Sequence, residues 1–164
     1  MTANNTFTSQ YNTPIGRVTM ASDGVALIGL WINGQKHFMA GIPSNATRRD
    51  DLQIFVRTRK WLDEYFWGHN PSISDLDLAP MGTDFQRAVW NELCKIPYGQ
   101  TITYGDIARR IGAFPRAVGS AVGCNRISVI IPCHRVVGAN GAITGYAAGI
   151  NTKIKLLQHE GVKL

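Results

Sequence analysis

The sequence predicts an α+β fold: a small N-terminal antiparallel sheet with one helix, followed by a mainly helical C-terminal domain that contains a helix-turn-helix. Short apolar runs separated by Asp-Gly and Asn-Gly dipeptides fill the first third of the chain. Two prolines then interrupt a stretch without periodicity, and three patterns with helix-start signals follow. The 164 residues are enough to bury one large core or two small ones.

Three strands are expected in the first third, at residues 7–11, 18–22 and 25–32. The dipeptides Asp23-Gly24 and Asn33-Gly34 stand where tight turns require positive φ. These runs and turns predict a small antiparallel meander.

One helix is expected at residues 50–66, because apolar residues recur there at roughly helical spacing. Its apolar face could cover the sheet. The stretch 68–81 contains Pro71 and Pro80 and reads as a connection between two parts of the molecule. We therefore expect an N-terminal domain over residues 1–75 and a C-terminal domain over residues 76–164.

Three helices are expected in the C-terminal domain. Thr83 and Gln86 have the spacing of a capping box, and the helix that follows ends before Pro97. The second helix begins after Thr103 and stops at Gly112, and the third opens at Pro115 and runs toward residue 123. The last two match a helix-turn-helix, although an ordinary helical hairpin in a core has the same pattern.

The third of these helices is composed mostly of small residues. Ala117, Gly119 and Ser120 follow Arg116, a long basic residue at the N-terminal end. Glycine is costly in a helix unless close approach to another surface compensates. That surface is either a neighbouring helix or the wall of a DNA groove.

The composition favours a polyanion as partner. The chain has 17 Lys and Arg against 11 Asp and Glu, a formal charge of +6. Its three cysteines, Cys94, Cys124 and Cys133, have no Cys-x-x-Cys spacing, so neither a disulfide framework nor a metal site is expected. Residues 1–10 resemble no secretory signal, and no run is long enough to span a bilayer, so we expect a cytoplasmic protein without membrane or cofactor.

Residues 133 and 134 are the strongest candidates for a catalytic pair. The apolar run 129–131 is typical of a buried strand and ends at Pro132, after which come Cys133 and His134. Histidine can take the proton of a cysteine nucleophile, and a carboxylate could orient the imidazole. In a continuing strand the two side chains would face opposite ways, so the chain must bend there. The alternative is an inert buried thiol beside a satisfied histidine.

A family resemblance bears on this choice. The segment Ile131-Pro132-Cys133-His134-Arg135-Val136, followed by Gly145-Tyr146, resembles the active-site signature of the O6-alkylguanine-DNA alkyltransferases. Further similarity extends over residues 82–161, and is looser in the N-terminal part, where the family has a ribonuclease H-like domain. The resemblance implies direct repair of alkylated DNA: irreversible transfer of an alkyl group from O6-alkylguanine, with O4-alkylthymine as a further candidate, to the protein itself.

The same resemblance implies roles for single residues. Cys133 is implied as the alkyl acceptor, His134 as its base through a water, and Glu160 as the carboxylate that orients His134. Tyr104 is implied to donate a proton or hydrogen bond to the guanine ring. The remaining implied positions are Arg116, which replaces the flipped nucleotide; Ala117, Gly119 and Ser120 in the minor groove; Asn125 at the hinge; and Val136, Tyr146 and Ala147 around the base.

Two further arginines are candidate DNA contacts. Arg126 stands where the family commonly has proline, and it could reach a phosphate. Arg135 lies within the signature itself. Double-stranded DNA containing O6-alkylguanine is the expected partner of a monomer that could assemble cooperatively on DNA. A non-catalytic module that binds alkylated DNA and a helix-turn-helix regulator are the alternatives, which the presence of Cys133 and the few base-reading side chains disfavour.

Overall fold

The computed structural model describes residues 5–164, so the expectation for residues 1–10 lies partly outside the described residues. The chain divides into two compact units, Met1–Met81 and Gly82–Leu164. The first holds β1 (Phe7–Thr13), β2 (Gly16–Ser22), β3 (Leu27–Ile32), β4 (Thr47–Arg48), α1 (Gln53–Phe66) and η1 (Ile73–Asp75). The second holds α2 (Asp84–Leu93), β5 (Ile102–Thr103), α3 (Tyr104–Ile111), α4 (Pro115–Gly123), η2 (Cys133–Arg135), β6 (Val136–Val137), η3 (Ala139–Gly141) and α5 (Ile150–His159).

The first unit is a four-stranded sheet in the order β3-β2-β1-β4. β1, β2 and β3 form the expected antiparallel meander, and Gly24 in the turn between β2 and β3 has the expected positive φ. Gly34 also has a positive φ, but its turn follows β3 and joins no two strands of the meander. The short β4 pairs with β1 in parallel, so the sheet is mixed and not purely antiparallel. A strand pair joined by a long connection is free to run parallel, which local turn signals cannot reveal.

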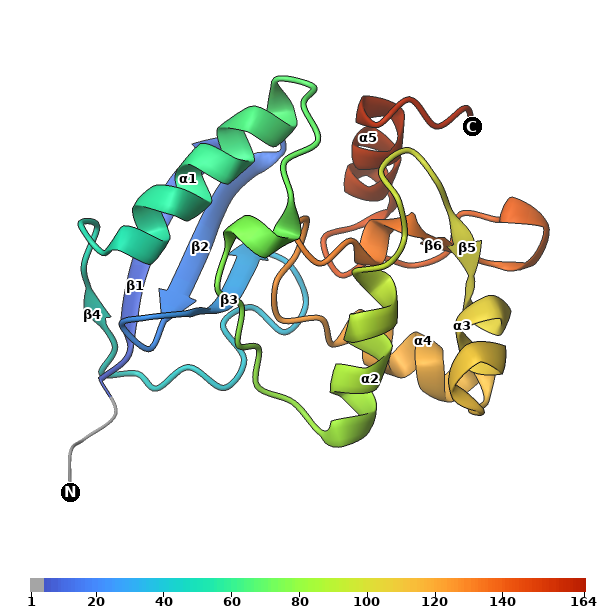
Figure 1. The fold of residues 1–164 in the computed structure, drawn as a ribbon, viewed down its shortest axis with the longest axis horizontal. Coiled ribbons are helices and arrows are strands. Elements are labelled where there is room, and N and C mark those ends of the chain that lie inside the picture. The colour runs from blue at the N-terminus through green and yellow to red at the C-terminus, as the bar shows by residue number, and fades with distance from the viewer. Residues whose placement is uncertain (1–4) are drawn as a thin grey trace. The chain divides into compact units, whose positions relative to one another are not determined.

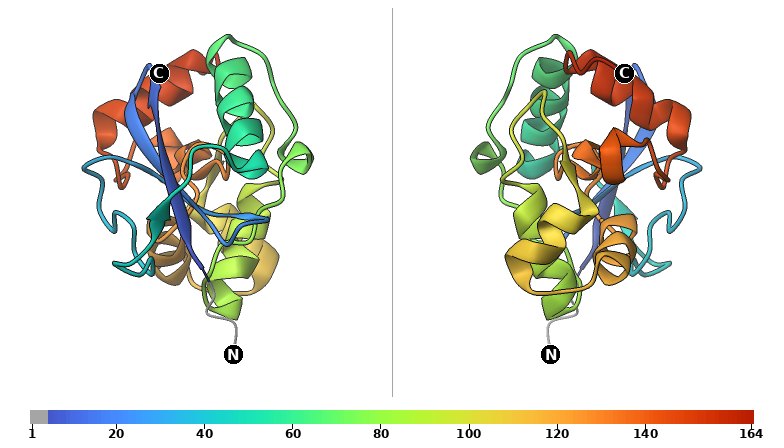
Figure 2. Two further views of the ribbon diagram at one scale, coloured as in Figure 1. Left: turned by 90° about the vertical axis from the view of Figure 1, so that its left-hand side faces the viewer. Right: turned by 90° about the vertical axis from the view of Figure 1, so that its right-hand side faces the viewer.

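Helix α1 lies beside the strands, as Figures 1 and 2 show from three directions. It begins at Gln53, later than expected, and its buried face is Ile54, Phe55, Thr58, Trp61, Leu62 and Tyr65. Val56, expected on that face, is 44% exposed. These buried positions recur at three- and four-residue spacing, so they form one face of the helix that covers the sheet.

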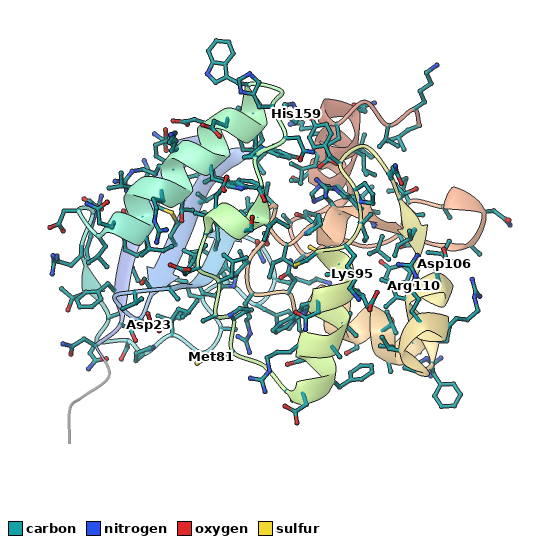
Figure 3. All side chains as sticks on the ribbon, viewed as in Figure 1. Asp23, Met81, Lys95, Asp106, Arg110 and His159 are labelled. Carbon is teal, nitrogen blue, oxygen red and sulfur yellow. The ribbon has the colours of Figure 1, made fainter. Side chains whose placement is uncertain are left out.

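The segment after α1 belongs to the sheet for part of its length. Leu27 of β3 donates its N–H to Asp77 O at 2.8 Å and accepts the Ala79 N–H at 2.9 Å. These hydrogen bonds keep residues 77–79 with the first unit. The division therefore falls after Met81, labelled in Figure 3, and not after residue 75.

The second unit is built on α2, α3 and α4, whose starts agree with their sequence signals. Thr83 and Thr103 both form capping boxes, and Gly112 ends α3 with a φ of 68°. Trp90 of α2 donates its indole N–H to Ala121 O of α4 at 2.9 Å, which fastens these two helices together. Helix α5 and the parallel pair β5–β6 were not expected from the sequence. Across residues 5–164, every helix is too short or too polar to cross a bilayer.

Candidate active site

The chain reaches Cys133 through a buried turn, so the strand expected at residues 129–131 is wrong. Residues 127–132 are all buried, but Ile131 N–H donates to Ile127 O at 3.1 Å and Val129 has a φ of 71°. β-branched residues favour strands only weakly, and tertiary contacts override that preference. A positive φ at valine is strained and persists only where the surroundings impose it.

Asn125 supplies that constraint. Its side chain is buried, and its amide donates to Ile131 O at 2.8 Å and to Ile127 O at 3.2 Å. Its Oδ1 accepts the Ile127 N–H at 3.1 Å. Because Asn125 comes just after α4, these three bonds tie the end of that helix to the segment that presents Cys133.

Cys133 and His134 lie on the short 3₁₀ helix η2, which starts after Pro132. The bend that the sequence requires is therefore present, and the alternation of side chains along a strand does not separate the two residues. Both are buried: Cys133 is 6% exposed and His134 is 0% exposed.

The carboxylate of Glu160, at the end of α5, forms hydrogen bonds with His134, Arg135 and Gly99. Oε2 lies 2.6 Å from His134 Nε2 and accepts from Arg135 Nη2 at 3.1 Å. Oε1 accepts from Arg135 Nε at 2.7 Å and from Gly99 N–H at 2.9 Å. Burial opposes ionisation of the carboxyl, but the hydrogen bonds from His134 and Arg135 outweigh it and hold the pKa of Glu160 well below its usual range.

The imidazole of His134 is set up as a proton acceptor. Burial lowers its pKa, and the charges of Arg135 and Lys153 act in the same direction, whereas Glu160 opposes the shift. The ring is therefore neutral at rest, and an ionised Glu160 requires the proton on Nε2. Nδ1 then carries a lone pair, and within residues 5–164 this buried atom has no hydrogen-bond partner.

The thiol of Cys133 is neutral at rest for the same reason. Burial raises its pKa, while hydrogen bonds with the side chains of Asn125 and Tyr146 and the charge of Lys153 stabilise the thiolate. A neutral thiol beside a neutral imidazole is the pair in which proton transfer creates both charges at the moment of reaction.

Lys153 is a functional candidate that the sequence analysis missed. It lies on α5, is 0% exposed, and donates from Nζ to Val136 O at 2.6 Å and to Thr144 O at 3.3 Å. Burial lowers its pKa, and the proximity of Cys133 partly offsets this. A signal was present: Lys153 shares one helical face with Leu156, Leu157 and Glu160, and a lysine on a buried face needs a partner.

Tyr104 is the first residue of α3 and is half-buried. Its hydroxyl oxygen accepts from Thr144 Oγ1 at 3.1 Å, so the phenolic proton stays available for another acceptor. A Cβ built on Gly119 would lie 3.8 Å from the Tyr104 ring, which places Tyr104 next to α4. Tyr104 thus joins the loop carrying Thr144 to the helix expected to contact DNA.

The remaining residues expected around a base border the same centre. Val136 belongs to β6, which pairs with β5 just before Tyr104. Tyr146 and Ala147 are half-buried in the irregular segment between η3 and α5. Of the two, Tyr146 acts on the Cys133 thiol, whose pKa its side chain lowers.

The residues expected to contact DNA lie mostly on the exposed side of α4. Arg116, Ala117 and Ser120 are exposed and Gly119 is half-buried, whereas Val118, Ala121 and Val122 face the core. More basic side chains stand on the neighbouring elements: Lys95 and Arg110, both labelled in Figure 3, lie 2.8 Å and 3.8 Å from the carboxylate of Glu92. The Glu92 side chain is only 13% exposed, but both basic side chains reach solvent, which weakens these ion pairs.

The expectation that Arg135 contacts DNA is wrong. Its side chain is buried, holds Glu160 by two bonds, donates to Ile96 O at 2.8 Å and lies over the Tyr98 ring. The guanidinium is thus part of the support of the active site. Arg126 is half-buried, which neither supports nor contradicts the expected phosphate contact.

No metal-binding cluster occurs in the described part of the chain, where His, Cys, Asp and Glu side chains nowhere gather in threes in a suitable arrangement. All three cysteines are free thiols.

Two family models match the chain. Residues 7–80 match the ribonuclease-like domain of 6-O-methylguanine DNA methyltransferase, and residues 84–162 match its DNA-binding domain. The methylated-DNA–protein-cysteine methyltransferase of Methanosarcina acetivorans is 43% identical over 155 residues, which cover 92% of this chain and 96% of the relative. The protein of the same name from Mycobacterium tuberculosis is 44% identical over 151 residues, 91% of this chain and 88% of the relative.

Solved structures agree. The chain is similar to the Mycobacterium tuberculosis protein OGT in complex with DNA, with a TM-score of 0.86 and 41% identity over 94% of this chain and 92% of that one. The O6-methylguanine-DNA methyltransferase of Pyrococcus kodakaraensis superposes with a TM-score of 0.70 at 25% identity, covering 96% of this chain and 99% of that one. The chain therefore belongs to the 6-O-methylguanine DNA methyltransferase family.

Proposed function

We propose that this protein repairs DNA by moving an alkyl group from O6 of guanine onto Sγ of its own Cys133. The observation that carries the proposal is the buried line of groups from Cys133 through His134 to Glu160, in which Nδ1 of a neutral imidazole is left as an acceptor. Family membership supports the same reaction, since the relatives are named for transfer from methylated DNA to a protein cysteine.

The transfer needs deprotonation of the thiol and a substitution at the alkyl carbon. The Cys133 thiol gives its proton to Nδ1 of His134, through a bridging water, and Glu160 stabilises the resulting imidazolium across the 2.6 Å contact. The thiolate then attacks the alkyl carbon, a carbon–sulfur bond forms, and the electron pair of the O6–carbon bond goes to O6.

The guanine oxyanion is a poor leaving group unless it is stabilised. We assign this task to Tyr104, because Thr144 already donates to its oxygen and the phenolic proton is left for the base. The proton lost by the thiol finally resides on guanine, so the reaction balances without a cofactor. The product on Cys133 is a thioether, which water does not cleave, and each protein molecule therefore repairs one lesion.

A base inside a duplex cannot reach a thiol that is 6% exposed, so the lesion must leave the helix stack. We place α4 in the minor groove, with Ala117, Gly119 and Ser120 against its walls and Arg116 in the gap left by the flipped nucleotide. Val136, Tyr146 and Ala147 surround the extruded base, and Asn125 keeps the helix and the thiol in register. Arg126 supplies a phosphate contact.

Intact-mass spectrometry tests the reaction. The protein is incubated with a short duplex that contains one O6-methylguanine, and we expect a gain equal to one methyl group, mapped by peptide analysis to Cys133. Binding to the lesion without a change of mass would indicate a non-catalytic binding module instead. Preference for one undamaged sequence would indicate a regulator.

The Arg116→Ala variant tests base extrusion. We expect single-turnover repair of a duplex lesion to slow by roughly tenfold or more, because an unfilled gap leaves the unstacking cost of a few kcal/mol uncompensated. Reaction with free O6-methylguanine base should stay unchanged. The exposed Arg48 of β4 provides the control, since Arg48→Ala removes a charge from the other unit. Equal losses on duplex and free base would contradict the proposed role of Arg116.

Lys153→Met tests the charge beside the thiol. Without the buried ammonium, the pKa of Cys133 should rise further, and transfer at neutral pH should slow by about tenfold. Raising the pH should recover part of the loss, which a rate profile against pH measures on the free base.

The exposed Lys155 on the same helix is the matched control. Lys155→Met should leave the profile unchanged, and a Lys153→Met profile identical to the wild type would remove Lys153 from the mechanism.

The proposal also covers the setting of the reaction. We infer a monomer in solution that acts in the cytoplasm and on the nucleoid, where its DNA substrate lies, and cooperative assembly on DNA is compatible with the formal charge of +6. O4-alkylthymine is a second candidate substrate.

Raising the salt concentration should weaken DNA binding, because phosphate contacts release counterions.

A further inference from the structure

Phe114 is a large aromatic side chain that packs against nothing substantial. It is the N-cap residue of α4, and it is 81% exposed. Burial of a phenylalanine is a main source of folding stability, and this one contributes almost none. Its place at the start of the proposed DNA-binding helix suggests that the ring acts outside the fold.

The position also gives up a local source of helix stability. Thr83 and Thr103 cap α2 and α3 with their side chains, but α4 has no side-chain cap hydrogen bond. Serine, threonine, asparagine or aspartate would normally supply one. A residue that breaks local rules without a gain in packing is a candidate for function.

Pro115 holds the phenylalanine in one backbone conformation. A residue before proline is restricted to extended φ and ψ, and Phe114 has a φ of −88° and a ψ of 142°. The direction of the Cα–Cβ bond is therefore largely fixed before any partner arrives, which lowers the entropy cost of using the ring in binding.

The surroundings of Phe114 favour a polyanion over an apolar protein partner. The sequence contains no Asp or Glu between Asp106 and Glu160, and Arg116 stands two residues from Phe114. Arg109 and Arg110 are also close in the chain, although Asp106 and Glu92 balance part of their charge. The first turn of α4 has no acidic residue, and its free N–H groups add partial positive charge at this end. Nucleic acid combines phosphates for these charges with flat apolar bases for the ring.

We propose that Phe114 is a second residue that opens the duplex. Its ring enters from the minor groove and stacks on a base next to the flipped nucleotide, while Arg116 occupies the vacated position. Apolar side chains inserted at a base step unstack and bend DNA, and every base offers a face for stacking. The proposal rests on the proposed function and adds a residue that determines how the lesion is exposed.

The first test compares two substrates. Phe114→Ala is expected to slow single-turnover repair of a duplex O6-methylguanine by about tenfold and to leave reaction with the free base unchanged. Phe114→Trp should keep most of the duplex rate. The control is Trp67→Ala, because Trp67 is 83% exposed in the other unit and should affect neither substrate. A duplex rate in Phe114→Ala equal to that of the wild type would overturn the proposal.

A serine at the same position separates function from structure. Phe114→Ser adds a capping hydroxyl and removes exposed apolar surface, so Tm should rise by about 2 to 4 °C. Duplex repair should nevertheless fall as it does in the alanine variant. If Phe114 served only to stabilise the fold, Tm and the rate of duplex repair would change in the same direction, and that result would overturn the proposal.

Fluorescence distinguishes stacking from other contacts. A 2-aminopurine placed next to the lesion should be quenched by the ring in the wild-type complex and remain bright with Phe114→Ala. If the variant instead alters self-association in sedimentation and not the fluorescence, the ring serves a protein interface and the proposal fails. If the wild-type protein modifies neither free base nor duplex, the proposed function itself fails, which is a different outcome.

Discussion

Replacement of Cys133 by serine is expected to abolish alkyl transfer and to leave DNA binding intact. The serine hydroxyl has nearly the same size, so the packing around a residue that is 6% exposed should survive. Its hydroxyl is far less acidic than a thiol and a much weaker nucleophile toward an alkyl carbon, so displacement of guanine should become negligible. Intact mass after incubation with a lesion-bearing duplex should show no methyl adduct, while a binding titration should match the wild type.

Cys124→Ser is the matched control, because Cys124 is a free thiol at the end of α4 that makes no part of the proposed centre. This variant should gain one methyl group at the wild-type rate. A methyl adduct on the Cys133→Ser protein would mean that the acceptor has been misassigned.

Glu160→Gln is expected to damage both stability and transfer. The carboxylate is the only anion paired with the buried Arg135 in the described structure, and it also holds His134. Glutamine keeps the shape but leaves a buried guanidinium without an opposite charge, which typically costs about 3 to 5 kcal/mol. Transfer to Cys133 should slow by at least about tenfold, because the imidazolium loses its stabilising charge.

Urea unfolding and single-turnover rates measure the two effects. Glu92→Gln is the control for stability: Glu92 also contacts two basic side chains, but these are exposed, so the loss should stay below about 1 kcal/mol. A Glu160→Gln protein as stable as the wild type would contradict the importance given to the buried carboxylate.

The dependence of stability on pH follows from the same two groups. The pKa of Glu160 is lower in the folded state than its ordinary 4.5, so its contribution is present above that pH and is lost as the pH falls below it. The pKa of His134 is lowered from 6.5, and the unfolded chain therefore binds a proton first as the pH falls below 6.5. Both groups make acid destabilising. Urea midpoints measured against pH should fall in two steps, and Glu160→Gln should flatten the lower one.

The position of Phe114 and that of Lys153 show two different ways in which the second unit departs from ordinary packing. The aromatic ring of Phe114 is exposed to water, and the ammonium of Lys153 is buried in the interior. Phe114 leaves the start of α4 without a side-chain cap, and burial of Lys153 carries the desolvation cost of a charge. Phe114 is close in the chain to Arg116, and Lys153 is close in space to Cys133. Arg116 and Cys133 both have a proposed part in repair.

Local signals in the sequence determined much of the second unit. The capping box at Thr83, the cap at Thr103, the left-handed Gly112 and the proline at position 115 predicted where α2, α3 and α4 begin or end, because each signal involves hydrogen bonds or dihedral angles within a few residues. The signature around Cys133 likewise pointed to the family, and the turn at Gly24 to the meander.

Tertiary structure alone decided the conformation of residues 127–132, the partner of Arg135 and the burial of Lys153. An apolar run such as 129–131 has the same composition in a strand and in a buried turn, and here the amide of Asn125 selects the turn. Arg135 and Lys153 look like ordinary basic residues until Glu160 and the carbonyls of Val136 and Thr144 are brought to them. Whether a charge faces water or the interior depends on residues distant in the chain, and no local pattern records that.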